Sequence, residues 1–128
     1  MSQANSLHNR AVWMDIPVAD LDRAAAFYRG VLAIQVEISD YEGFKFGILE
    51  HEHGNGGCLV PNAEEIVSNG GLLVYMNVDG RIRDAESKVT ALGGKVLQGT
   101  HAIGPHGFRA IVLDSEGNRI ALHSETDA

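Results

Sequence analysis

Cysteine, secretory features and long apolar runs are scarce or absent in this sequence, and each absence excludes a class of protein. Cys58 is the only cysteine among the 128 residues, which rules out an intrachain disulfide and a zinc site built from several thiolates. No segment approaches the roughly 18 apolar residues that a membrane-spanning helix needs. The opening MSQANSLHNR lacks the apolar core of a secretory signal. We therefore expect a cytoplasmic protein that does not span a membrane.

Basic residues are also few. Ten Lys and Arg stand against seventeen Asp and Glu, and the formal net charge is −7. Without a basic stripe to offset this charge, binding to nucleic acid is disfavoured. The hydrophobic content of 45% is ordinary for a globular protein. A chain of this length has room for one domain with one core and a pocket for a small molecule.

The first half of the chain is predicted to form one strand, one helix and three further strands. Asp20 is a typical helix N-cap, and apolar residues follow it at helical spacing. Glycines mark the later turns. The expected elements are a strand at 11–18, a helix at about 20–32, and strands at 34–38, 44–49 and 58–60.

The second half repeats this order after a polar connector at 61–70. The expected elements are a strand at 72–78, a helix at about 81–92, and strands at 95–97, 108–113 and 120–123. A duplicated unit should align with itself, with small changes of offset where loops differ. At an offset of 60, Val18 matches Val78, and at an offset of 64, FKFGILE (44–50) matches FRAIVLD (108–114). The sequence therefore predicts two tandem βαβββ units.

Four segments resemble the vicinal oxygen chelate superfamily, which includes glyoxalase I, bleomycin-resistance-type proteins, fosfomycin-resistance enzymes and extradiol dioxygenases. They are IPVADLDRAAAFYRGVLA at 16–33, LLVYMNVD at 72–79, the Leu92-Gly93-Gly94 helix exit, and GFRAIVLDSEGNRIALHS at 107–124. The resemblance implies an α+β fold in which two βαβββ units form a curled mixed sheet around a cleft. It also implies a homodimer.

The predicted domain covers residues 10–124, with unit one at about 10–60, the connector at 61–70 and unit two at about 71–124. Residues 1–9 are expected to be a flexible N-terminus, and residues 125–128 a tail.

The resemblance also implies where a metal would bind. In metal-dependent members, His and Glu ligands on matching strands hold a divalent cation that polarises substrate oxygens. The matching positions on the first, fifth and last strands fall on Trp13, Leu73 and Ala121. Internal alignment makes Cys58 the partner of Ala121. Because the first three cannot bind a metal, we predict that the usual site, and any cofactor, is absent.

A shift of two residues in that alignment would bring Asp15, Tyr75 and His123 to the same three positions. A divalent metal held by this shifted set is therefore the alternative.

Strand alternation directs one group of side chains into the expected cleft. The predicted ligand-binding residues are Trp13, Cys58, Leu73, Tyr75, Asn77, Phe108, Arg109 and Ala121. His123 is the predicted proton donor or acceptor, with Asp15 orienting it if the two touch. Four of these residues also have a purely structural interpretation. Trp13 could pack in the core, and Cys58 could be an inert buried thiol. His123 could be a hydrogen-bonded histidine at a strand end, and Asp15 a carboxylate that is solvated or paired with an arginine.

Four other histidines lie at predicted turns. His51 and His53 have a spacing that places two imidazoles on one side of a strand, but a solvated hairpin end is the favoured interpretation. His101 and His106 flank Gly104-Pro105, a predicted loop over the cleft of the second unit.

Three functions remain open from the sequence. The first is a metal-independent protein that binds a small organic molecule in an aromatic-lined cleft. The second is a lyase, isomerase or dioxygenase that uses the shifted ligand set. The third is a subunit that recognises another protein through an exposed sheet edge or the cleft.

Overall fold

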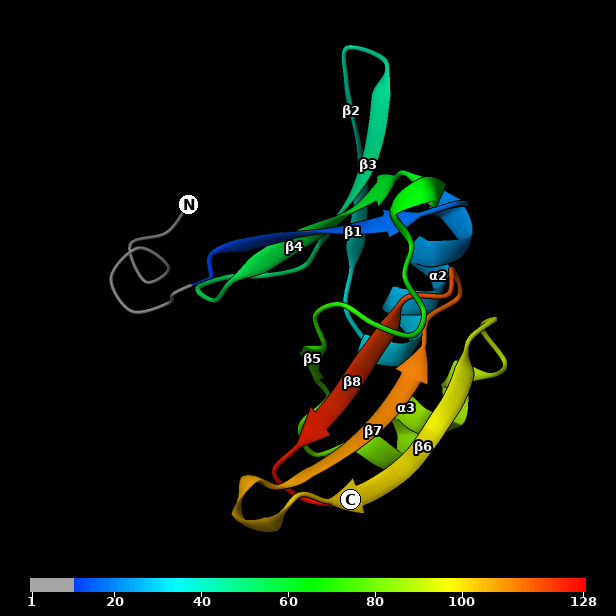
Figure 1. Ribbon diagram of the computed structural model, residues 1–128. Coiled ribbons are helices and arrows are strands. Elements are labelled where there is room, and N and C mark those ends of the chain that lie inside the picture. The colour runs from blue at the N-terminus through cyan, green and yellow to red at the C-terminus, as the bar shows by residue number, and fades with distance from the viewer. Residues whose placement is uncertain (1–10) are drawn as a thin grey trace.

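The computed structural model describes residues 11–128, and the predicted N-terminal segment at 1–9 lies outside the described residues. Unit one contains β1 (Trp13–Val18), α2 (Leu21–Leu32), β2 (Val36–Tyr41), β3 (Phe44–Leu49) and β4 (Gly56–Pro61). Unit two contains β5 (Val74–Asn77), α3 (Ile82–Val89), β6 (Lys95–Ala102), β7 (Phe108–Leu113) and β8 (Arg119–Ser124). Short 3₁₀ turns lie at Ala63–Glu65 and Gly104–His106. The predicted repeat of the βαβββ order is confirmed (Figure 1).

Each unit forms its own four-stranded mixed sheet. The strand orders are β1-β4-β3-β2 and β5-β8-β7-β6, so the two sheets have the same topology and stay separate. In each sheet the first strand pairs in parallel with the last, and the other pairs are antiparallel. β1 and β5 are therefore edge strands, and each has one side that pairs with no strand of the described chain.

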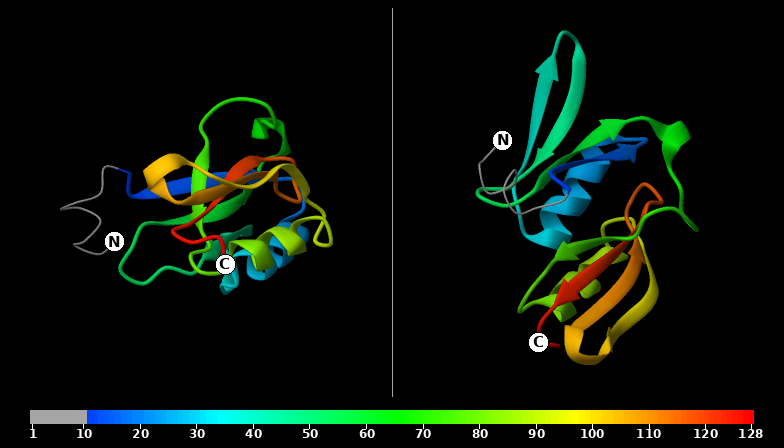
Figure 2. Two further views of the ribbon diagram at one scale, coloured as in Figure 1. Left: turned by 90° about the horizontal axis from the view of Figure 1, so that it is seen from below. Right: turned by 60° about the vertical axis from the view of Figure 1, so that its left-hand side comes forward.

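The helices cover one face of the sheets. α2 packs on β2, β3 and β4, α3 packs on β6, β7 and β8, and the two helices contact each other. Figure 2 shows them together on one side of the molecule. Their apolar faces and the facing strand residues form one core, which includes Phe27, Tyr28, Leu59 and Val112. Within residues 11–128, no α-helix covers the opposite face of either sheet (Figure 2).

The start of α2 follows the predicted capping chemistry. The carboxylate of Asp20 accepts a hydrogen bond from the backbone N–H of Arg23 at 3.0 Å, which satisfies one of the unpaired donors at a helix start. Ala33 ends the helix in the left-handed conformation with φ of 57°.

Unit two differs from the prediction at three boundaries. β5 is limited to Val74–Asn77, and α3 ends at Val89, after which the Gly94 N–H donates to the Val89 carbonyl at 2.8 Å. Gly93, with φ of 95°, provides the left-handed turn at this exit. β6 extends to Ala102 because irregular pairing with β7, with two register shifts, continues it past Leu97.

The Asp114-to-Asn118 turn, which carries part of the family resemblance, joins the two units. The buried Asp114 carboxylate accepts hydrogen bonds from the Tyr28 hydroxyl at 2.6 Å and from the Asn118 side chain at 2.9 Å. Glu116 accepts from the backbone N–H groups of Ala19 and Asp20 at 2.9 and 2.8 Å. This turn therefore has a structural role, because its side chains hold the two units together.

Among residues 11–128, no helix has the length and apolarity to cross a membrane.

Candidate functional site

A trough runs between the edge strands of the two sheets. It consists of two adjoining cavities of about 670 and 510 Å³. Met14 of β1, Leu72 before β5, and Val74 and Met76 of β5 line both cavities, so we call the pair the inter-unit trough. Its apolar lining and size are typical of a site for a small organic molecule.

The larger cavity has aromatic side chains from both sheets. Trp13 of β1 and Tyr75 of β5 line it, together with Asn77 and His51. The rings of Trp13 and His51 meet edge to face, with centroids 5.4 Å apart. Trp13 is 38% exposed, so the interpretation of Trp13 as a core residue is wrong. This tryptophan instead presents its ring to the trough.

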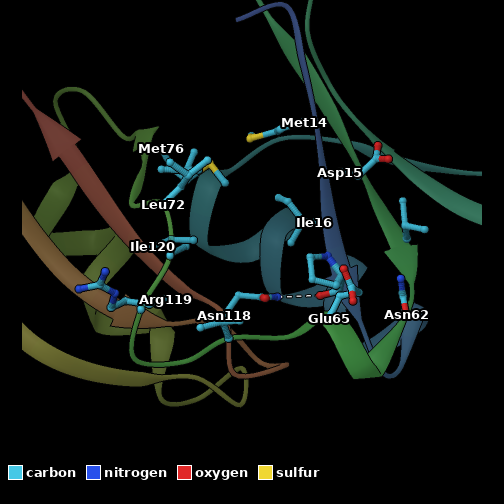
Figure 3. A pocket seen from close by; sticks show the side chains of 16 residues that line it. Met14, Asp15, Ile16, Asn62, Glu65, Leu72, Met76, Asn118, Arg119 and Ile120 are labelled. Atoms are coloured by element: carbon cyan, nitrogen blue, oxygen red, sulfur yellow. Dashed lines mark hydrogen bonds between the residues drawn. The ribbon is translucent and has the colours of Figure 1, made fainter.

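The smaller cavity combines an apolar wall with polar groups. Figure 3 shows Met14, Ile16, Leu72, Met76 and Ile120 near one another, with Asp15 and Asn62 on the other side. The Asn118 amide donates to the Pro17 carbonyl at 2.7 Å and so links the walls (Figure 3).

Asp15 and Cys58 meet on the open face of the first sheet. The two are register partners in the β1–β4 pair, and the Cys58 thiol donates to the Asp15 carboxylate at 3.2 Å. Burial, reinforced by the neighbouring carboxylate, raises the pKa of the Cys58 thiol, although a hydrogen bond from Trp13 opposes this change. The thiol is 7% exposed, which agrees with its interpretation as a buried group.

A row of four polar side chains crosses the open face of the second sheet. The register places His101 beside Arg109, Arg109 beside His123, and His123 beside Asn77. Arg109 donates through Nε to His101 Nε2 at 3.1 Å and through Nη1 to the Tyr75 hydroxyl at 2.6 Å. The open face of the second sheet thus groups Tyr75 with three basic side chains, namely His101, Arg109 and His123.

His123 and Asp15, the predicted catalytic pair, do not hydrogen-bond to each other. On the second sheet, His123 Nε2 hydrogen-bonds to the His106 carbonyl at 2.8 Å. On the first sheet, the Asp15 carboxylate accepts a hydrogen bond from the Cys58 thiol. The Tyr75 and His123 rings lie 6.1 Å apart in an edge-to-face arrangement. The structure thus agrees with His123 as a hydrogen-bonded strand-end histidine, and it gives Asp15 a thiol as its partner.

Three other predicted contact residues have different surroundings. Leu73 lies before β5 and lines neither cavity. Phe108 packs against the hydrophobic core, which leaves its neighbour Arg109 on the open face. Ala121 is fully buried, opposite Tyr75 in the register.

Sequence reasoning missed two parts of this arrangement. His101 was interpreted as a loop residue because β6 was expected to end at Leu97, whereas it lies on the strand beside Arg109. Met14 and Met76 alternate toward the core side of their strands. They reach the trough because the two sheets stay separate. The alternation of residues along each strand could not show this separation.

The register shows which side chains stand at the positions where the superfamily resemblance implies metal ligands. The register sets Asp15 opposite Cys58 and Tyr75 opposite Ala121, which favours Asp15 and Tyr75 over Trp13 and Leu73 as the matching positions. Such a set offers one carboxylate and one protonated thiol. Within residues 11–128, no three His, Cys, Asp or Glu side chains are grouped closely enough to hold an ion.

Comparison with known proteins identifies the fold. No family model matches the sequence, and no curated protein matches it. A glyoxalase/bleomycin resistance protein/dioxygenase family enzyme from Burkholderia phytofirmans PsJN aligns with a TM-score of 0.70 and 18% identity, over 88% of this chain and 95% of that one.

Two further solved structures agree. A glyoxalase-related enzyme from Fulvimarina pelagi aligns with a TM-score of 0.69 and 17% identity, over 90% of this chain and 87% of that one. The fosfomycin resistance protein FosX from Listeria monocytogenes aligns with a TM-score of 0.68 and 13% identity, over 89% and 91%. The chain has the fold of the vicinal oxygen chelate superfamily, as predicted. Structural matches at such low sequence identity establish the fold alone, so the function has to be argued from the site.

Proposed function

We propose that this protein binds a small organic molecule in the inter-unit trough without the metal site of its structural relatives. The observation that carries the proposal is the lining of the larger cavity of about 670 Å³, where Trp13 and Tyr75 stand beside apolar side chains such as Met14. Aromatic walls supply large contact area and fixed geometry for a ligand. The matching metal positions lack a complete ligand set, so recognition rests on packing and hydrogen bonds.

A fragment screen followed by amide ¹H–¹⁵N spectra tests this proposal. Binding is expected to shift the amide signals of Met14, Trp13, Val74 and Met76, and a Met76→Trp variant that fills the trough is expected to reduce these shifts. Tyr41→Ala, at the exposed hairpin away from the cavity lining, is the matched control. Hits that shift only signals outside the trough would refute the proposal.

The alternative is a metal-dependent lyase, isomerase or dioxygenase, and one observation favours it. Two members of the shifted set, Tyr75 and His123, lie close together with ring centroids 6.1 Å apart, and Asp15 of the first sheet would have to join them to hold an ion. Mass spectrometry of divalent metals in tag-free, dialysed protein distinguishes the two functions. Near one metal per chain would favour the enzyme, and a metal-free folded protein would favour the binding function.

We also propose that the protein is a homodimer in the cytoplasm. The unpaired edges of β1 and β5 support association, because such edges are ready templates for strand pairing. Apolar side chains flank them: Leu72 is 89% exposed and Val67 49% exposed. The single buried cysteine suits a reducing compartment.

Sedimentation equilibrium tests the dimer with the variant Leu72→Asp. A charge at this position is expected to weaken the dimer by about tenfold or more, since it would be desolvated at the interface. Val12→Asp, next to the β1 edge of the first sheet, provides a second test, and Tyr41→Asp, on the β2–β3 hairpin, is the control. A wild-type chain that stays monomeric at high concentration would contradict the proposal.

A further inference from the structure

The strands of the second sheet carry basic side chains and no acidic ones. Their sequences VYMN, KVLQGTHA, FRAIVL and RIALHS contain no Asp or Glu. They contain Lys95, Arg109 and Arg119, besides two histidines. Such a sheet is unusual in a chain with a net charge of −7. Among the charged residues on these strands, all are therefore basic.

Among residues 11–128, Arg109 has no carboxylate partner. Arg23, Arg81 and Arg83 each form an ion pair with an Asp or Glu. In contrast, the side-chain hydrogen bonds of Arg109 within residues 11–128 go to the His101 ring and the Tyr75 hydroxyl. The segment MSQANSLHNR, outside the described residues, contains no acid that could pair with Arg109. A guanidinium has five N–H donors, so this arginine retains donors and an unbalanced positive charge.

The neighbours hold Arg109 in place and add a donor. His101 accepts from Arg109 through Nε2, and its Nδ1 lies 2.8 Å from the Gly99 carbonyl, so the ring is the neutral tautomer with its proton on Nδ1. The Tyr75 oxygen accepts from Arg109, which leaves the Tyr75 hydroxyl hydrogen available. Arg109 and Tyr75 thus present N–H and O–H donors side by side, in the arrangement that binds a carboxylate.

Tyr75 connects this donor pair to the trough. It lines the larger cavity and bonds to Arg109 across β8, above the fully buried Ala121. The acidic residues that line the trough all belong to the first unit or the connector, namely Asp15, Glu50, Glu52 and Glu65. They would repel an anion from that wall, so a ligand with one negative charge would orient toward the second unit.

We propose that Arg109 and Tyr75 bind the carboxylate of a small organic acid whose apolar part lies in the inter-unit trough. This inference rests on the proposed function and specifies the chemical class of its ligand. One guanidinium matches one carboxylate in charge and in fork geometry. The aromatic and apolar lining matches the hydrocarbon part.

The inference is tested with two probes of nearly the same shape, one a charged carboxylate and the other a neutral carboxamide. Cyclohexanecarboxylate and cyclohexanecarboxamide do not absorb where tryptophan is excited, and Trp13, the only tryptophan, lines the cavity and reports binding. The carboxylate is expected to bind about tenfold more tightly than the amide, because a charge-assisted hydrogen bond contributes more than a neutral one. In Arg109→Gln this preference is expected to disappear, so that the two probes bind with similar affinity.

Two variants make the test specific. Arg83→Gln removes the same charge from α3, where Arg83 pairs with Asp127, and is expected to retain the preference. Tyr75→Phe keeps the ring and is expected to reduce the preference by about threefold, which provides a second readout if Arg109→Gln does not fold. Equal affinity for both probes would overturn the inference and leave the proposed function standing. Binding of neither probe, or a preference that survives Arg109→Gln, would also overturn it.

Discussion

Individual residues show how the two units are held together. Tyr28 in α2 and Asp114 in the second unit are both buried, and the Tyr28 hydroxyl donates to the Asp114 carboxylate at 2.6 Å. Burial and the adjacent carboxylate raise the pKa of Tyr28 well above its usual value. The phenol therefore keeps its proton and remains a donor at all physiological pH values. The helix and turn motifs that identify the fold thus serve to join its halves.

Tyr28→Phe is expected to lower the free energy of unfolding by about 1–3 kcal/mol, since a buried acceptor loses one of its partners. Urea denaturation followed by circular dichroism measures this change. Tyr41→Phe, which alters an exposed tyrosine, is the matched control and should change stability little. Equal stability of the two variants would show that the Tyr28–Asp114 bond does not stabilise the unit interface.

Glu116 gives a prediction about acid stability. Burial alone would favour its neutral form, but the hydrogen bonds from Arg23, the Asp20 backbone, Ser115 and the Ala19 backbone lower the pKa of Glu116 to about 2, from an ordinary value of 4.5. Because the folded pKa is the lower one, the ionised carboxylate stabilises the fold fully above pH 4.5. This stabilisation is lost as the pH falls toward 2.

Glu116→Gln is therefore expected to be less stable than the wild type at pH 7, with a difference that shrinks steadily below pH 4.5. Urea midpoints measured at several pH values between 7 and 2.5 test this. Glu125→Gln, an exposed acid of the C-terminal tail, is the control. A difference that stays constant across this range would contradict the assigned role of Glu116.

At the scale of elements, local chemistry determines α2 more than α3. The side chain of Asp20, directly before α2, caps that helix, whereas the side chain of Arg81, directly before α3, forms no cap hydrogen bond. Asp20→Ala is expected to cost about 1 kcal/mol of stability. Asp22→Ala, in the first turn of the same helix, is the matched control with a smaller cost. Thermal unfolding compares the two, and an equal loss would contradict the cap assignment.

The elements also show what the sequence could predict and why the rest lay beyond it. Apolar spacing and the Asp20 cap predicted α2, and alternation predicted β7 with its observed bounds. β6 was predicted to end at Leu97, whereas pairing with β7 across two register shifts extends the strand to Ala102. The partnership of His101 with Arg109 depends on that irregular register, so local patterns could not reveal it.

At the scale of the whole molecule, the repeat and the fold followed from the sequence, but the trough did not. Strand alternation placed Trp13 and Tyr75 on one face and the two methionines Met14 and Met76 on the other. All four line the larger cavity because the sheets present neighbouring edges and do not form one continuous surface. The angle between the units is a tertiary property. Tyr28, Asp114 and Glu116 help to set it through contacts between residues far apart in the sequence.

The most direct test of the account is whether ligand binding in the trough needs a metal. Trp13 fluorescence would be titrated with cyclohexanecarboxylate in protein treated with a chelator, and again after Mn²⁺ or Zn²⁺ is added back. The account predicts saturable binding with the same affinity in both samples. Binding that appears only when metal is restored would contradict it and would make the metal-dependent enzyme the better explanation of this fold.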